Sequence, residues 1–204
     1  MIKIAVLVSG GGTNLQALID AQKSGILNGG SIALVLSNNP NAYALQRAKD
    51  AGIKRCVLVK KDYASQADYE DALIELLRAN GIELIVLAGF MSILGKRFID
   101  AYEHRIINVH PSLIPSFCGQ GFYGLRVHEA ALAKGVKVTG ATVHFVNEIP
   151  DGGEIILQKA VKVAKKDTPE TLQKRVMRQA EWIILPKATQ MICEKLMKEK
   201  GEKV

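Results

Sequence analysis

A short apolar stretch, residues 106–115, carries two polar side chains whose types and spacing suit acyl-transfer chemistry. Successive side chains of a strand point to opposite faces, so Asn108 and His110, two positions apart, share one face. Pro111 has no N–H for a strand ladder, so we expect His110 to end the strand at the mouth of a sheet. There the amide can donate to a developing oxyanion while the imidazole moves a proton. The alternative is a histidine that merely closes a strand end, held by backbone groups.

A glycine-rich turn, residues 9–14, follows the first predicted strand. Residues 2–8 are nearly all apolar, which is typical of a strand buried on both faces of a parallel sheet. A helix with apolar spacing starts around Leu15 and stops at Gly25. This layout directs free backbone N–H groups and the positive end of a helix dipole toward an anion. The turn has neither a dinucleotide fingerprint nor a P-loop, so we predict a monophosphate site; a tight turn without a ligand is the alternative.

Strand-like and helical segments alternate along the chain. After the first strand, we predict strands at 31–37, 55–59, 83–89, 106–110, 136–146 and 154–163. The alternation predicts an α/β fold with a doubly wound, mostly parallel sheet, and the strand at 154–163 pairs antiparallel near the C-terminal part. No repeat, low-complexity tract or linker interrupts the pattern, so we expect a single domain over residues 1–204.

The expected helices lie between these strands and after the last one. They end near residues 25, 52, 80 and 134, and the last begins after Thr168 and is interrupted at Pro186. Three segments follow the carboxyl ends of parallel strands: the glycine-rich turn, residues 91–94, and the pair Asn108 and His110. Ligands of open α/β sheets bind at that edge, so we expect the three segments to converge on one crevice.

Two further polar residues lie in the C-terminal half of the chain. On the strand at 136–146, Thr142 and His144 share one face, and we interpret His144 as a hydrogen-bonded structural residue rather than a catalyst. Asp151 lies in a turn, where such side chains commonly bond their own backbone.

Composition indicates a globular protein of the cytoplasm. The chain has 204 residues, 48% hydrophobic and 23% charged, without a signal-peptide pattern or an apolar run that spans a bilayer, so we expect no membrane partner. The cysteines Cys56, Cys118 and Cys193 are odd in number and form no C-x-x-C. This argues against a disulfide framework and a zinc site, and for a reducing compartment.

The formal charge of +7 does not by itself indicate a nucleic-acid partner. Residues 159–204 hold 12 Lys and Arg against 6 Asp and Glu, which accounts for +6 and is typical of a solvated surface. Aromatic residues make up 5%, without the interleaving of basic and aromatic side chains that stacks bases. We therefore expect small anionic substrates and no nucleic acid, and we leave the oligomeric state open.

Four motifs together resemble those of the phosphoribosylglycinamide formyltransferase family, the folate-dependent enzymes of purine synthesis. They are Ser-Gly-Gly-Gly-Thr-Asn-Leu at 9–15, Leu-Ala-Gly-Phe-Met at 87–91, Asn-Val-His-Pro-Ser-Leu-Ile-Pro at 108–115, and Asp-Gly-Gly at 151–153 followed by Ile-Leu-Gln at 156–158. The resemblance extends over essentially the whole chain. It implies transfer of the formyl group of 10-formyltetrahydrofolate to the amine of phosphoribosylglycinamide, without a metal.

The same resemblance implies roles for individual residues. The implied catalytic residues are Asn108, His110 and Asp151. The implied substrate contacts are Gly12, Thr13 and Asn14 for the phosphate and Glu181 for the amine. The implied folate contacts are Met91, Ser92, Ile93 and Leu94, through backbone groups, and Asn108. In this arrangement Asp151 orients the imidazole of His110 and favours its charged form.

Some local features depart from the pattern of that family. Gln66 stands where several members have a basic residue, and Ser92 replaces a common arginine. The loop at 116–124 is longer than in many members, and the segment at 176–181 carries one residue more than the usual spacing.

Other functions compatible with the motifs are a deformylase, which passes the formyl group to water, and a methionyl-tRNA formyltransferase. Both usually carry an extra domain, for which 204 residues leave no room. Outside enzymes, the alternative is a nucleotide-sensing binding module that uses the same crevice.

Overall fold

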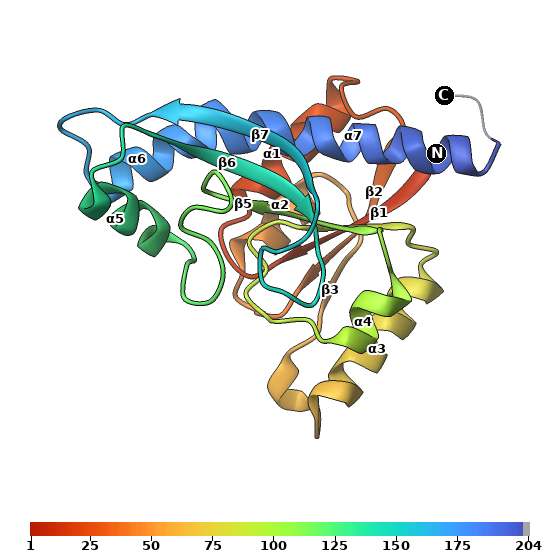
Figure 1. The fold of residues 1–204 in the computed structure, drawn as a ribbon. Coiled ribbons are helices and arrows are strands. Elements are labelled where there is room, and N and C mark those ends of the chain that lie inside the picture. Colours follow the sequence, from red (N-terminus) through yellow and green to blue (C-terminus); the bar gives the residue numbers. More distant parts are fainter. Residues whose placement is uncertain (202–204) are drawn as a thin grey trace.

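A seven-stranded sheet runs through the computed structural model, which describes residues 1–201 (Figure 1). Its strands are β1 (Ile2–Val8), β2 (Gly30–Ser37), β3 (Arg55–Val57), β4 (Leu84–Leu87), β5 (Ile106–His110), β6 (Val138–Phe145) and β7 (Ile155–Lys162). The strand order is β3-β2-β1-β4-β5-β6-β7, with antiparallel pairing at β5–β6 and β6–β7 and parallel pairing elsewhere. The predicted doubly wound, mostly parallel α/β fold with antiparallel pairing near the C-terminal part is confirmed. The single domain over 1–204 stays a prediction, and its last three residues lie outside the described residues.

Helices cover both faces of the sheet (Figure 1). They are α1 (Thr13–Lys23), α2 (Tyr43–Asp50), α3 (Gln66–Ala79), α4 (Lys96–Ala101), α5 (Leu125–Lys134), α6 (Pro169–Val176) and α7 (Trp182–Glu199). A 3-10 turn, Lys60–Asp62, precedes α3, and a π-helical turn, Met177–Glu181, joins α6 to α7. Among the described residues, no helix combines the length and apolarity needed to cross a membrane.

Two apolar cores lie on opposite faces of the sheet. Along β1, Ile4 and Val6 belong to one core while Ala5 and Leu7 belong to the other, as strand alternation requires. Residues of α1, α2, α5, α6 and α7 close the first core, and residues of α3 and α4 close the second. Because both faces of β1 are buried, its sequence is almost continuously apolar.

Two details of the predicted elements are wrong. The helix that contains Pro186 is not interrupted there, because α7 continues to Glu199 with the proline inside it. A proline lacks the N–H of the helical ladder and its ring crowds the carbonyl four residues earlier. Here the wider π-helical turn directly precedes α7 and loosens the ladder at that point. The third strand ends at Val57 rather than residue 59, because the chain then turns into the 3-10 segment.

The topology brings three distant segments to one edge of the sheet. The strand order reverses between β1 and β4, and β5 lies next to β4, so the carboxyl ends of these three strands are neighbours. The antiparallel register then adds β6, with His144 opposite Asn108 and Thr142 opposite His110. The sheet therefore places residues from both halves of the chain around one crevice.

Candidate active site

The two polar residues of β5 lie at the end of a buried strand. His110 is the last residue of β5, as predicted, and is 4% exposed. Asn108 lies one pleat earlier on the same face and contacts His144, with 3.2 Å between Asn108 Nδ2 and His144 Nε2. The amide and imidazole of β5 therefore face a second imidazole contributed by β6.

Asp151 reaches this pair from the loop between β6 and β7. Its Oδ2 lies 3.4 Å from His110 Nδ1, and its Oδ1 lies 3.5 Å from His144 Nε2. The backbone N–H of Gly119 donates to Oδ2 at 2.8 Å. Asp151 has φ of 56°, a left-handed conformation that non-glycine residues seldom adopt, and such conformations gather at functional sites.

The glycine-rich loop at 116–124 covers the imidazole of His110. The carbonyl oxygen of Phe117 lies 2.8 Å from His110 Nε2, and Phe117 also has a left-handed φ, of 51°. The two ring nitrogens of His110 thus both face acceptor oxygens, those of Phe117 and Asp151. A neutral imidazole donates from one nitrogen only, whereas an imidazolium donates from both.

Burial and neighbouring charges act on His110 in opposite directions. Burial has the largest effect and lowers its pKa; the Asp151 carboxylate and the Phe117 carbonyl raise it, and the net pKa lies below the ordinary value. The influence expected of Asp151 thus has the predicted direction, but burial outweighs it. For Asp151 itself, burial again has the largest single effect and raises the pKa. The hydrogen bond from His144 and the charge of His110 more than offset it, so the pKa of Asp151 is lowered.

His144 lies beside the candidate catalytic residues, although the sequence predicts only a structural role for it. His144 is 2% exposed and hydrogen-bonded on both ring nitrogens, as the structural interpretation expected, with Nδ1 2.7 Å from the carbonyl oxygen of Phe145. Its other partners, however, are Asn108 and Asp151. The only signal in the sequence was the alternation that places His144 on one face with Thr142; the pairing register that aligns it with Asn108 was not visible.

A second histidine went unnoticed in the sequence. His128, on α5, is 0% exposed, and neither of its ring nitrogens has a hydrogen-bond partner among the described residues. Burial, with a smaller contribution from His110, lowers its pKa to about 4. His128 is therefore uncharged at neutral pH, and it packs near His110 as a neutral ring.

A cavity of about 160 Å³ adjoins Asn108, His144 and Asp151. Its remaining lining residues are Leu87, Phe90, Ser92, Ile93, Leu94, Val146, Asn147, Glu148, Ile149 and Pro150. The lining combines apolar side chains with several polar groups, as is common in sites for small organic ligands. Four of the five residues expected at the folate, Ser92, Ile93, Leu94 and Asn108, thus line this cavity.

Met91, the fifth residue expected there, does not line the cavity. It is 54% exposed, and its backbone N–H donates to Ser9 Oγ at 2.8 Å. A similar bond joins Asn38 Nδ2 to Ser92 Oγ at 2.7 Å. Gln66 donates from Nε2 to the carbonyl oxygen of Ile93 at 3.2 Å. These bonds connect the cavity segment to the glycine-rich turn and to α3.

The glycine-rich turn lies at the start of α1, where free backbone N–H groups can meet an anion. Gly12 has φ of 70°, and a Cβ at this position would lie 2.6 Å from the Cβ of Ala44, so a side chain is excluded. Arg47 Nε donates to the carbonyl oxygen of Gly11 at 2.8 Å. Thr13 is the first residue of α1. The turn thus has a glycine where a side chain would clash, and the positive charge of Arg47 lies beside it.

Asn14 and Glu181 meet behind this turn although 167 residues separate them. Asn14 Nδ2 donates to Glu181 Oε2 at 2.7 Å, and Glu181 is 4% exposed. Burial raises the pKa of Glu181 to about 7, and the bond from Asn14 only partly opposes it. Glu181 ends the π-helical turn Met177–Glu181. A π turn holds one more residue than an α turn, and Glu181, its last residue, is buried. The additional residue expected in this segment stays a prediction.

Within residues 1–201, no group of three or more His, Cys, Asp and Glu side chains is arranged to hold a metal ion.

Comparisons with known proteins agree over nearly the whole chain. A family model described as formyl transferase matches residues 2–189. The phosphoribosylglycinamide formyltransferase of Haemophilus influenzae is 42% identical over 186 residues, which cover 91% of this chain and 84% of that protein. The crystal structure of glycinamide ribonucleotide transformylase 1 from Symbiobacterium toebii has a TM-score of 0.89 and 42% identity, covering 96% of this chain and 89% of that one.

A longer relative matches equally well. The trifunctional purine biosynthetic protein adenosine-3 of Gallus gallus is 44% identical over 191 residues, or 94% of this chain. The match covers 18% of that protein, so the chain spans less than a fifth of its length.

Proposed function

The chain belongs to the formyl transferase family, and from this membership we propose that it transfers the formyl group of 10-formyltetrahydrofolate to the amine of phosphoribosylglycinamide in purine biosynthesis. The observation that carries the proposal is the meeting of Asn108, His110 and Asp151, with 3.4 Å between Asp151 Oδ2 and His110 Nδ1. An amide donor, a buried imidazole and a carboxylate are the groups that an acyl transfer needs.

The cavity beside Asn108 suits the ring system of the folate. Apolar walls from Phe90, Leu94 and Val146 can cover the faces of a flat ring, and the polar end brings the transferred group to Asn108 and Asp151. Ile93 is exposed, so the part of the folate beyond its ring system can extend past this residue into solvent. We assign Ser92, Ile93, Leu94 and Asn108 to the folate pocket. Met91 has a supporting role, because its backbone N–H donates to Ser9 Oγ and so fixes the segment at 91–94 against the glycine-rich turn.

Asn108 and His110 act on the reacting groups in turn. As the amine nitrogen attacks the formyl carbon, Asn108 Nδ2 donates to the formyl oxygen, where negative charge develops. Neutral His110 accepts the proton that the attacking amine loses. The same proton then passes from His110 to the folate nitrogen, which leaves as its bond to the formyl carbon breaks. The lowered pKa of His110 makes the imidazolium a better acid in this second step.

The nitrogen that exchanges this proton is His110 Nε2. Asp151 holds Nδ1 and stabilises the imidazolium between the two proton transfers. In this structure His110 Nε2 is hydrogen-bonded to the carbonyl oxygen of Phe117. The loop at 116–124 therefore has to move away from Nε2 before the substrate can exchange a proton with it.

The other substrate lies along the glycine-rich turn. Backbone N–H groups of Gly12, Thr13 and Asn14 bind its phosphate at the start of α1. Glu181 accepts a hydrogen bond from the substrate amine and orients it, with Asn14 holding the carboxyl in place. Because the pKa of Glu181 is about 7, this carboxyl can also take the proton of an ammonium ion.

We further propose that the protein acts in the cytoplasm as a single domain on small-molecule substrates, without nucleic acid, membrane or metal. All three cysteines are free, which accords with a reducing compartment.

The test is an assay of purified protein with phosphoribosylglycinamide and 10-formyltetrahydrofolate. We expect deformylated folate to appear only when the amine substrate is present, in a one-to-one ratio with the formylated product. Release of formate without the amine would instead indicate a deformylase. Formylation of methionyl-tRNA at a comparable rate would contradict the proposed substrate.

A further inference from the structure

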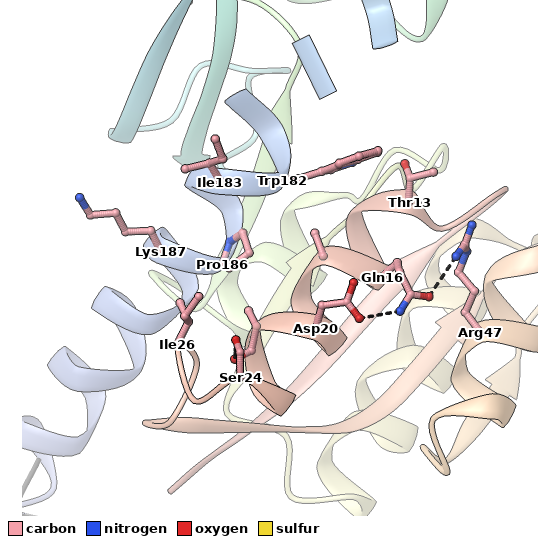
Figure 2. A pocket seen from close by; sticks show the side chains of 12 residues that line it. Thr13, Gln16, Asp20, Ser24, Ile26, Arg47, Trp182, Ile183, Pro186 and Lys187 are labelled. Atoms are coloured by element: carbon pink, nitrogen blue, oxygen red, sulfur yellow. Dashed lines mark hydrogen bonds between the residues drawn. The ribbon is translucent and has the colours of Figure 1, made fainter. Parts of the chain in front are cut away.

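A groove of about 690 Å³ runs between α1 and α7 beside the glycine-rich turn (Figure 2). Its lining residues are Thr13, Gln16, Ala17, Asp20, Ala21, Ser24, Ile26, Arg47, Trp182, Ile183, Pro186 and Lys187. Of the residues assigned above to catalysis or substrate binding, only Thr13 belongs to this set. The groove is therefore separate from the folate cavity and continuous with the phosphate site.

One end of the groove is suited to an anion. Thr13 begins α1, and Arg47 reaches over the turn from α2, with bonds to the carbonyl oxygen of Gly11 at 2.8 Å and to Gln16 Oε1 at 2.9 Å. These bonds use two of the five N–H donors of a guanidinium. Gln16 in turn donates to Asp20 Oδ1 at 2.9 Å, so a hydrogen-bonded chain follows the floor of the groove (Figure 2).

The middle of the groove is suited to a flat ring. Figure 2 shows the Trp182 side chain pointing from the start of α7 toward Thr13. On α1, Ala17 and Ala21 have small side chains, which leave room beside the indole. An aromatic face of this kind can stack on the face of a base.

We propose that this groove binds a purine nucleoside 5′-monophosphate, with the phosphate on the glycine-rich turn and the base against Trp182. The ligand would follow α1, where Thr13 and Ala21 are eight positions apart and so about 12 Å apart, at about 1.5 Å per residue. The base stacks on the face of the Trp182 indole, and its exocyclic amino group can donate to Asp20. This proposal rests on the phosphate site of the proposed function, and it makes the nucleotide a competitor of phosphoribosylglycinamide but not of the folate.

The first test compares two phosphates by calorimetry on the whole protein: ribose 5-phosphate, which lacks a base, and AMP. Stacking on an aromatic side chain strengthens binding, so AMP should bind at least about tenfold more tightly, which equals about 1.4 kcal/mol. Trp182 is the only tryptophan of the chain, so AMP should also quench its fluorescence while ribose 5-phosphate leaves it unchanged. Equal affinities would overturn the groove proposal alone. Failure of both to bind would overturn it together with the phosphate site of the proposed function.

Two variants that change opposite walls of the groove locate the base: one fills it with a larger side chain, and the other places a negative charge in it. Ala17→Phe on α1 and Ile183→Asp on α7 should each reduce the affinity for AMP to that for ribose 5-phosphate, and each should keep formyl transfer. Ala67→Phe, at an exposed position of α3, is the matched control and should change neither affinity. If AMP keeps its advantage in both groove variants, or if wild-type protein associates through this groove in sedimentation and ignores AMP, the proposal is wrong.

Discussion

Two carboxyl groups, Asp151 and Glu181, lie at the same crevice, but their pKa values are shifted in opposite directions. Asp151 has several donors around it, including the N–H of Gly119 at 2.8 Å and the nearby rings of His110 and His144, and its pKa is lowered. Glu181 is more deeply buried and accepts a hydrogen bond from Asn14 Nδ2, and its pKa is raised to about 7. Burial raises the pKa of both carboxyl groups. At Asp151 the hydrogen bonds and the charges of the neighbouring histidines outweigh burial, whereas at Glu181 the bond from Asn14 does not.

The difference separates the two carboxyl groups by task. A carboxylate that is always charged can stabilise an imidazolium throughout a reaction, which suits Asp151 beside His110. A carboxyl that is half-ionised at neutral pH gains a charge when a cation arrives, which suits Glu181 beside a substrate amine. We therefore expect changes around Asp151 to act mainly on kcat and changes at Glu181 to act mainly on KM.

The largest effect should come from His110→Ala, which removes the imidazole that faces the Asp151 carboxylate. We expect kcat to fall about 10²- to 10⁴-fold, the usual contribution of a positioned acid or base, while both substrates still bind. Steady-state kinetics and calorimetric titration measure the two quantities. His104→Ala, at a histidine whose side chain is 69% exposed, is the matched control and should retain activity. If the His110→Ala variant bound the substrates less well but kept its kcat, the assignment of His110 to proton transfer would be wrong.

Asp151→Asn should have the next largest effect, about tenfold to a hundredfold on kcat, because it removes the charge and keeps the shape. The Asp151 carboxylate raises the pKa of His110, so its loss should lower that pKa further. The acid limb of kcat/KM, which reports protonation of His110 in the free enzyme, should therefore move to lower pH. Asp167→Asn, at a carboxylate paired with Arg175, is the control and should leave the limb in place. A limb that moves to higher pH would contradict the assigned charge of Asp151.

Glu181→Gln should have the smallest kinetic effect, an increase of about tenfold in KM for phosphoribosylglycinamide at pH 8 with little change in kcat. Below pH 7 the wild-type carboxyl is itself mostly neutral, so the two proteins should converge at pH 6. Glu70→Gln, at another buried glutamate, should leave this KM unchanged. An equal increase in KM at both pH values would show that Glu181 acts without its charge.

The same substitution tests the raised pKa without substrate. The folded protein holds the Glu181 proton up to about pH 7, whereas an unfolded glutamate loses it near 4.5. Stability contributed by this group is therefore present at low pH and lost as pH rises through that window. Relative to wild type, Glu181→Gln should gain up to about 3 kcal/mol of unfolding free energy between pH 4 and pH 8, measured by denaturant titration. A constant difference would contradict the raised pKa.

Sequence periodicity was sufficient for the sheet but not for every helix. β1 and β4 are nearly all apolar because both of their faces are buried, and this pattern can be recognised from the local sequence. The predicted interruption at Pro186 is wrong, because α7 continues through the proline. The π-helical turn before α7 has no recognised local pattern in the sequence.

The sequence by itself determined the strand end at His110, the glycine-rich turn, and the convergence of both on one sheet edge. Strand alternation, the missing N–H of proline and the shared polarity of parallel strands are local rules, so they could be applied without coordinates. Only the tertiary structure decided that His144 contacts Asn108 and Asp151, that burial outweighs Asp151 at His110, and that Glu181 meets Asn14 with its pKa near 7. Pairing register, desolvation and contacts across 167 residues depend on how the whole chain packs, and no local pattern records them.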